Sequence, residues 1–169
     1  MIGAVVLAAG AATRFGAPKQ QLLLGEVLAR LRAAPVDEIV VVAGAHELPT
    51  TAALARCADW ERGPGASLRC GLAALAPGTE AAVVVLADGP DLAPAAVARV
   101  IDEWRASGGD LVAASYGGAR GHPLLLARHA WDDVPDEGLR ARTARLVPCD
   151  DLGAPGDVDV PADLPARLR

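Results

Sequence analysis

The 169-residue sequence has few aromatic residues, little net charge, no asparagine and a single lysine, Lys19. Aromatic residues make up 3% of the chain, and the formal net charge is −5. An extended nucleic-acid surface needs a basic stripe and stacking rings. We therefore expect no nucleic-acid partner, although the composition leaves a single nucleotide possible as a ligand.

Cysteine is also scarce. Cys57, Cys70 and Cys149 are odd in number, and no two of them form a CxxC pair. This pattern favours a reduced cytoplasmic chain over a disulfide framework or a zinc site. Long apolar runs are missing too: the apolar start, residues 2–9, has no basic leader and is far shorter than a membrane span. We expect neither a signal peptide nor a membrane anchor.

The lone lysine is the strongest bias in the composition. The other 15 of the 16 basic residues are Arg, so the chain uses Arg wherever the two are interchangeable. A compact ammonium and a planar guanidinium do different chemistry. Lys19 is therefore a candidate for a position where Arg will not serve, with chance survival on a solvated surface as the alternative.

Three short apolar runs, residues 4–9, 39–43 and 82–87, are rich in Val and are followed by Gly or Asp. Continuous rather than alternating runs indicate strands that are covered on both faces, as in a parallel sheet. The remaining predicted elements are helices over residues 20–33, 47–58, 66–76, 94–107 and 161–168, and strands over residues 110–116 and 122–127. This alternation predicts an α/β fold: a three-layer α/β/α sandwich with a Rossmann-like, mostly parallel sheet, in one domain over residues 1–169.

Ligands of open α/β sheets bind beyond the carboxyl ends of the strands. The first apolar run is followed there by a loop of small residues that carries Arg14 and ends at Lys19. Such a loop lets backbone N–H groups approach phosphate oxygens, and the two basic residues add positive charge. Its spacing fits neither a Walker A loop nor GxGxxG. A tight structural turn is the alternative, but the two basic residues favour a phosphate site.

The loop resembles the signature of a known family. Residues 7–19, LAAGAATRFGAPK, are similar to the LAAGxSxRxGxxK motif of MobA-like NTP transferases, especially the molybdenum cofactor cytidylyltransferase branch. Further segments follow in the family's order: GASLRCGL at 65–72, LADGPDL at 86–92, GHP at 121–123, DEGLR at 136–140 and DVDVPADL at 157–164. The chain departs from the family at Ala12, Gly89 and Pro135, where Ser, Gln and Gly are usual. The resemblance implies the nucleotide-diphospho-sugar transferase type of fold.

The resemblance also implies a reaction: transfer of CMP from CTP to a phosphorylated acceptor such as the molybdopterin cofactor, with release of pyrophosphate and with Mg²⁺ as cofactor. CTP is favoured because Ala9 stands where guanylyl relatives carry a second Gly. The alternatives are guanylyl or sugar-phosphate nucleotidylyl transfer and, from another class, a degenerate, non-catalytic nucleotide-binding module. The last stays open because the chain is short between Leu24 and Val36, and the family's strand between Cys57 and Trp60 is hardly present. We expect a monomer or weak dimer with no membrane partner.

An acidic pair is the predicted metal site. Asp88 follows the third apolar run, and a carboxylate beside phosphates implies a bridging cation. Mg²⁺ prefers oxygen ligands. Asp91 is the better cap for the helix that begins near Pro94, which favours the metal role for Asp88. The resemblance gives Asp159 as the second ligand, with Asp157 or a helix-capping role for Asp159 as alternatives.

The other roles follow the matching motifs. Arg14, Lys19 and Asp88 are the predicted catalytic residues. His122 and Arg140 are predicted to bind the acceptor, with ordinary hydrogen bonding as the alternative for His122. N-capping of a helix is the alternative for Ser67. The predicted nucleotide-binding residues are Leu7, Ala8, Ala9, Gly10, Arg14, Lys19, Gly65, Ser67 and Asp88.

Overall fold

The computed structural model describes residues 1–10 and 17–169, and only the backbone of residues 17–20. Arg14 and the side chain of Lys19 lie outside the described residues. The described part forms a seven-stranded sheet in the order β3-β2-β1-β4-β6-β5-β7. The strands are β1 Ile2–Leu7, β2 Glu38–Ala43, β3 Ala53–Arg56, β4 Ala81–Leu86, β5 Leu111–Tyr116, β6 Ala119–Ala127 and β7 Arg145–Pro148. Strand β6 is antiparallel to β4 and β5, and the other neighbours are parallel.

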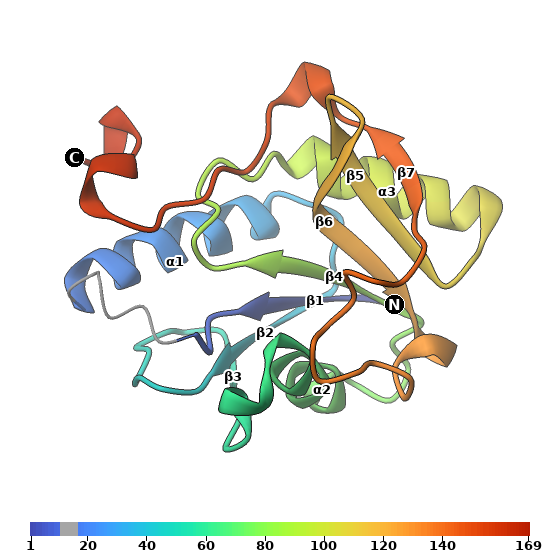
Figure 1. Ribbon diagram of the computed structural model, residues 1–169, viewed down its shortest axis with the longest axis horizontal. Helices are drawn as coiled ribbons and strands as arrows, with labels where there is room; N and C mark the ends of the chain where they lie inside the picture. Colours follow the sequence, from blue (N-terminus) through green and yellow to red (C-terminus); the bar gives the residue numbers. More distant parts are fainter. Residues whose placement is uncertain (11–16) are drawn as a thin grey trace.

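Helices cover both faces of this sheet (Figure 1). Helices α1 (Ala17–Arg32) and α3 (Pro94–Ser107) pack on one face, and α2 (Pro64–Ala74) packs on the other. Successive strand side chains point to opposite faces, so Val6 lies in the layer under α1 and α3 and Val5 lies in the layer under α2. The predicted three-layer α/β/α sandwich with a mostly parallel sheet is confirmed.

Helix α3 has the predicted bounds because its ends are marked locally. Pro94 occupies the first turn, where a missing N–H costs nothing. Gly108, with φ of 66°, ends the helix and donates its amide to the Trp104 carbonyl. These two signals are strong enough for the sequence to fix both ends.

The helix predicted over residues 47–58 is wrong. That segment contains β3, which pairs in parallel with β2 from Val40 to Ala43. The unpaired backbone groups of β2 offer hydrogen bonds that outweigh the helical spacing of Ala and Leu in the segment. No strand lies between Cys57 and Trp60, as predicted; the strand of this region, β3, ends before them at Arg56.

The predicted C-terminal helix over residues 161–168 is also wrong. Two short 3-10 turns, Pro161–Asp163 and Ala166–Leu168, replace it. Pro165 disfavours helical backbone at the residue before it, and Leu164 is accordingly extended, with ψ of 132°. The chain therefore breaks into two turns rather than one helix.

The cysteines correct another prediction. Cys57 and Cys70 form a disulfide, with their Cα atoms 5.8 Å apart, and Cys149 is free and buried. The expectation of a chain without disulfides is wrong because α2 packs against β2 and β3, which brings Cys70 beside the residue that follows β3. The two cysteines are 13 residues apart in the sequence, and no local pattern predicts that they come together. Among the described residues, no helix is both long and apolar enough to span a membrane.

Candidate functional site

The candidate site lies at the carboxyl edge of the sheet, where β1 and β4 end side by side. Leu7 and Leu86 are paired in the parallel register of these strands. The chain continues the pairing beyond the strands, since the amide of Ala87 donates to the Leu7 carbonyl at 3.1 Å. The residues that directly follow β1 and the turn that carries Asp88 are therefore neighbours, as parallel strands require.

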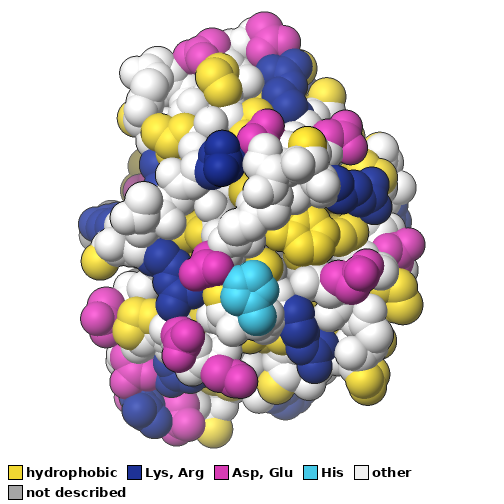
Figure 2. Space-filling view, turned by 90° about the vertical axis from the view of Figure 1, so that its right-hand side faces the viewer, with side chains coloured by type: hydrophobic (Ala, Val, Ile, Leu, Met, Phe, Trp, Pro, Cys, Tyr) yellow, Lys and Arg dark blue, Asp and Glu magenta, His cyan; other side chains and the backbone are white. Residues whose placement is uncertain are grey.

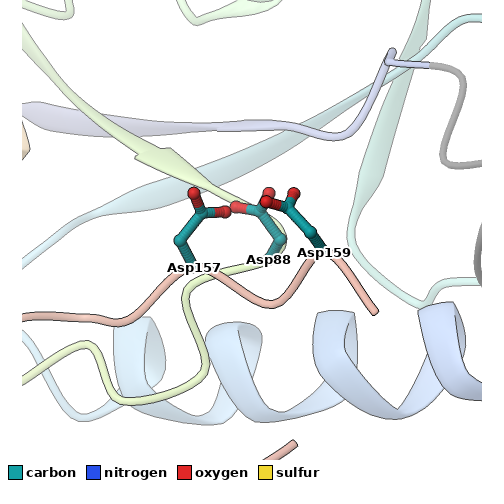
Figure 3. Close-up of side chains that lie close together, drawn as sticks. All are labelled: Asp88, Asp157 and Asp159. Carbon is teal, nitrogen blue, oxygen red and sulfur yellow. The ribbon is translucent and has the colours of Figure 1, made fainter. Parts of the chain in front are cut away.

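Three carboxylates meet at this edge. Asp88 follows β4, whereas Asp157 and Asp159 come from the C-terminal segment, and one carboxylate oxygen of each lies within 4.8 Å of the others. Figure 3 shows the three side chains converging at the end of β4. The structure thus brings together the predicted pair Asp88 and Asp159, and it adds Asp157, which the sequence offered only as an alternative to Asp159.

The C-terminal segment is held in place by its backbone. The amide of Val158 donates to the Asp88 carbonyl at 3.1 Å. Val158 itself is buried in a small apolar cluster with Leu23 of α1. Because Asp157 and Asp159 flank this buried residue, both lie on the exposed side of the segment, where they can reach Asp88.

The electrostatics of Asp88 reflect this arrangement. Burial, followed by the negative charge of Asp157 and that of Asp159, raises the pKa of Asp88 to about 6. Its Oδ1 atom is buried and has no hydrogen-bond partner among the described residues. A buried carboxylate oxygen without a partner is costly. An all-oxygen donor set with excess negative charge fits a hard divalent cation such as Mg²⁺.

The competing helix-cap roles are not used. The N-cap residue of α3 is Ala93, with no side-chain capping bond, so the prediction that Asp91 caps this helix is wrong. The Asp91 carboxylate instead forms an ion pair with Arg167 at 2.7 Å. The turn after the cluster has Val160 as its N-cap residue, and the carboxylate of Asp163, rather than that of Asp159, accepts the Val160 amide at 3.2 Å.

The predicted phosphate loop is described only at its start. Leu7 and Ala8 are half-buried and Gly10 is exposed, whereas Ala9 is 3% exposed and packs in the layer under α2. The methyl group of Ala9 therefore faces the core. After residues 11–16, which are outside the described part of the chain, α1 begins at Ala17. The backbone of Lys19 lies in the first turn of this helix.

Gly65 and Ser67 lie at the start of α2, and both are buried. The N-cap residue is Gly63, so Ser67 is not the cap. A Cβ atom on Gly65 would lie 1.6 Å from the Pro135 carbonyl oxygen. Glycine is therefore required here so that the segment 134–140 can lie against α2.

This contact involves two arginines and a carboxylate that the sequence did not single out together. Arg69 of α2 donates to the Val134 carbonyl and to the Asp136 carboxylate, and Arg62 pairs with the same carboxylate at 3.0 Å. Hydrogen bonds from Arg69, and then those from Arg62, lower the pKa of Asp136. The only signal in the sequence was the match of residues 136–140 to a family motif.

The two predicted acceptor residues, His122 and Arg140, differ in exposure: His122 is half-buried and Arg140 is exposed. His122 precedes a cis peptide bond to Pro123 in β6. Burial, together with the charge of Arg120, lowers the pKa of His122 to about 4, so its ring is neutral at pH 7. Val84 of β4 pairs with Leu124 in an antiparallel register, which places His122 near the end of β4, at the same sheet edge.

The fold and this edge define an α/β protein with a Rossmann-like sheet and a candidate ligand site beyond its carboxyl ends. Residues 4–147 match the family described as the MobA-like NTP transferase domain. The chain therefore belongs to the MobA-like NTP transferase family and is a nucleotidyltransferase. Asp157 and Asp159 follow the matched range.

Solved structures agree with this assignment. Rv0371c from Mycobacterium tuberculosis is 30% identical, with a TM-score of 0.80, and the alignment covers 99% of this chain and 96% of that one. A structure of Rv0371c in complex with manganese is 28% identical, with a TM-score of 0.73 and coverage of 96% and 95%. A nucleotidyl transferase from Methanothermobacter thermautotroptrophicus shares the fold at 20% identity, with a TM-score of 0.73 and coverage of 96% and 94%. No curated protein matches the chain.

Proposed function

We propose that this nucleotidyltransferase transfers CMP from CTP to a phosphorylated small-molecule acceptor, such as the molybdopterin cofactor, and releases pyrophosphate. The observation that carries the proposal is the cluster of Asp88, Asp157 and Asp159 beside the end of β1, with its buried, unpartnered Asp88 oxygen. A carboxylate cluster of this kind, at the sheet edge where the predicted phosphate loop begins, fits a site for a triphosphate and a divalent cation.

The proposed chemistry requires charge stabilisation rather than a strong base. The acceptor phosphate is already an anion at neutral pH, so its oxygen can attack the α-phosphorus directly, in line with the departing pyrophosphate. Catalysis then consists of positioning and charge stabilisation, as in other phosphoryl transfers. Lys19 and Arg14 would bind the triphosphate and stabilise the leaving pyrophosphate.

The carboxylate cluster would hold the divalent cation. Asp88 and Asp159 are the proposed ligands, and Asp157 is a third oxygen donor within reach. When bound, Mg²⁺ or Mn²⁺ would offset the charge of the phosphates. Oxygen ligands suit both ions, and the manganese complex of Rv0371c supports this class of cofactor.

Substrate preference is proposed from the resemblance. Residues 8–10, Ala-Ala-Gly, resemble the cytidylyl branch, and this resemblance supports CTP over GTP. His122 and Arg140 are the proposed acceptor contacts, and the neutral ring of His122 would act as a hydrogen-bond donor or acceptor rather than as a charge.

The direct test is pyrophosphate release with CTP or GTP, the molybdopterin cofactor and Mg²⁺. We expect turnover with CTP. Loss of one electrostatic contact costs about 10²–10³ in rate, so Lys19→Met and Asp88→Asn should each lower turnover by that order. Asp132→Asn, which removes one exposed carboxylate outside the cluster, is the matched control and should retain full activity.

Several outcomes would overturn parts of the proposal. Full activity in both site variants contradicts the assigned site, and turnover with GTP alone contradicts the preference for CTP. A thermal-shift panel separates the non-catalytic alternative: Mg²⁺-dependent stabilisation by CTP without any turnover would identify a binding module. The absence of a shift with every NTP would contradict the nucleotide site itself.

A further inference from the structure

The C-terminal residues 155–169, here called the strap, lie across α1 and the turn that follows β4 (Figure 1). The strap supplies two of the three clustered carboxylates, Asp157 and Asp159. Like charges repel, so their approach to Asp88 requires attractive contacts elsewhere along the strap. These contacts decide how well the cluster is preorganised for a cation.

Two backbone hydrogen bonds join the strap to the turn. The amide of Asp91 donates to the Pro155 carbonyl at 2.9 Å, and the amide of Val158 donates to the Asp88 carbonyl at 3.1 Å. Gly89 permits this close approach, since a Cβ atom there would lie 3.0 Å from the Cβ atom of Pro155. These bonds hold the front of the strap.

Arg167 holds its far end. One guanidinium nitrogen lies 2.7 Å from the Asp91 carboxylate. Another donates to the Pro90 carbonyl at 3.2 Å and lies 3.8 Å from the Glu26 carboxylate of α1. A single planar side chain therefore joins the strap, the turn that carries Asp88, and α1.

An apolar contact lies between these two attachments. Val158 and Leu164 are buried against Leu23 of α1, and Leu168 packs on the same cluster. Burial of this cluster fixes the strap on α1, the helix whose first turn contains Lys19. The strap thus connects the proposed cation ligands with the helix that carries the proposed triphosphate ligand.

We propose that Arg167 is a positioning residue for the carboxylate cluster: by fixing the strap to Asp91, Pro90 and Glu26, it preorganises Asp157 and Asp159 opposite Asp88 for a divalent cation. This inference rests on the proposed function of the cluster. The hydrogen bonds and ion pairs of Arg167 go to Pro90, Asp91 and Glu26 rather than to the three carboxylates, so it would act through Asp91 and the strap. Groups that orient ligands in this way raise metal affinity without binding the metal.

The test is direct Mn²⁺ binding to the chelator-treated protein, measured without nucleotide from the EPR signal of free Mn²⁺. Outer partners of metal ligands contribute about 10–100-fold to affinity, and we expect Arg167→Ala to raise the Kd about tenfold. Arg167→Lys keeps the charge and should recover part of the loss. Arg99→Ala is the matched control, because Arg99 also bonds one carboxylate and one proline carbonyl, those of Asp151 and Pro148.

The controls separate this inference from the proposed function. Asp88→Asn should abolish specific Mn²⁺ binding; unchanged binding would overturn the cation site itself. If Asp88→Asn abolishes binding but Arg167→Ala binds as tightly as the wild type, the positioning role is wrong and the site stands. Equal weakening by Arg167→Ala and Arg99→Ala would indicate general loosening and would also overturn the role of Arg167. If Arg167→Ala fails to fold, Asp91→Asn removes the same ion pair and serves in its place.

Discussion

Asp88 lies beside two other carboxylates, Asp157 and Asp159, and one of its oxygens is buried. In the cation-free protein this arrangement lowers the free energy of unfolding. The pKa of Asp88 is about 6 in the fold, against an ordinary value of 3.8 for an aspartate. The folded state therefore binds the proton more tightly than the unfolded state. The penalty is absent below about pH 3.8, grows as the pH rises, and is complete above about pH 6.

The first prediction at the residue scale follows from this loss of stability above pH 6. In EDTA at pH 7.5, Asp88→Asn should raise the free energy of unfolding. A shift of about two pKa units sets a ceiling of about 3 kcal/mol, which solvent screening lowers to roughly 1–2 kcal/mol. At pH 4 the gain should be small. Urea denaturation at the two pH values measures the difference.

Asp132→Asn is again the control, and it should change stability little at either pH. If Asp88→Asn is less stable than the wild type at pH 7.5, the claim that the ionised Asp88 carboxylate destabilises the cation-free fold is wrong. Saturating Mn²⁺ should reverse the order, because a cation that binds only the folded wild type stabilises it by mass action.

At the scale of elements, two helical glycines differ in their surroundings. Gly25 of α1 is exposed, and a Cβ atom there would have no neighbour within 4 Å. Gly71 of α2 lies on the sheet, where a Cβ atom would be 2.5 Å from a methyl carbon of Val5 and 2.7 Å from one of Val42. Helix propensity favours Ala at both positions, but packing opposes it at Gly71.

We therefore expect opposite effects from the same substitution. Gly25→Ala should stabilise the protein by about 0.5–1 kcal/mol, since Ala loses less backbone entropy on folding. Gly71→Ala should destabilise it by about 1–3 kcal/mol, which is typical of overpacking. Urea denaturation of the two variants compares them directly. Stabilisation by Gly71→Ala would mean that α2 does not pack on β1 and β2 this closely.

At the scale of the whole molecule, one sheet carries both apolar layers. Val5 and Val6 are neighbours in β1 but lie in different layers, so neither layer can come apart without disturbing the other. On the face that Figure 2 shows, acidic and basic side chains are interspersed around a central apolar area. Exposed ion pairs contribute little to stability. The main contribution to the stability of the fold is therefore the burial of apolar side chains in the two layers.

We propose on this basis that residues 1–169 form a single domain that unfolds cooperatively. Differential scanning calorimetry of the cation-free protein should give one transition, with a calorimetric enthalpy equal to the van't Hoff enthalpy. Two resolved transitions would contradict the single domain.

The sequence by itself determined the features that depend on neighbours along the chain. The apolar runs gave β1, β2 and β4 because strands buried on both faces need continuous apolar residues. Pro94 and Gly108 gave both ends of α3. Asp88 could be singled out because it follows a buried strand, where ligands of such sheets bind.

Only the tertiary structure decided the features that depend on the order of the strands and on distant contacts. It pairs the residues of β3 with β2, joins Cys57 to Cys70, and brings Asp157 as well as Asp159 to Asp88. Arg167, one of 15 arginines, had no local signal for its contact with Asp91. The physical reason is that local patterns specify which residues are buried and where helices end. The partner of an edge strand, a cysteine or a charge is set only when the sheet and its two layers assemble.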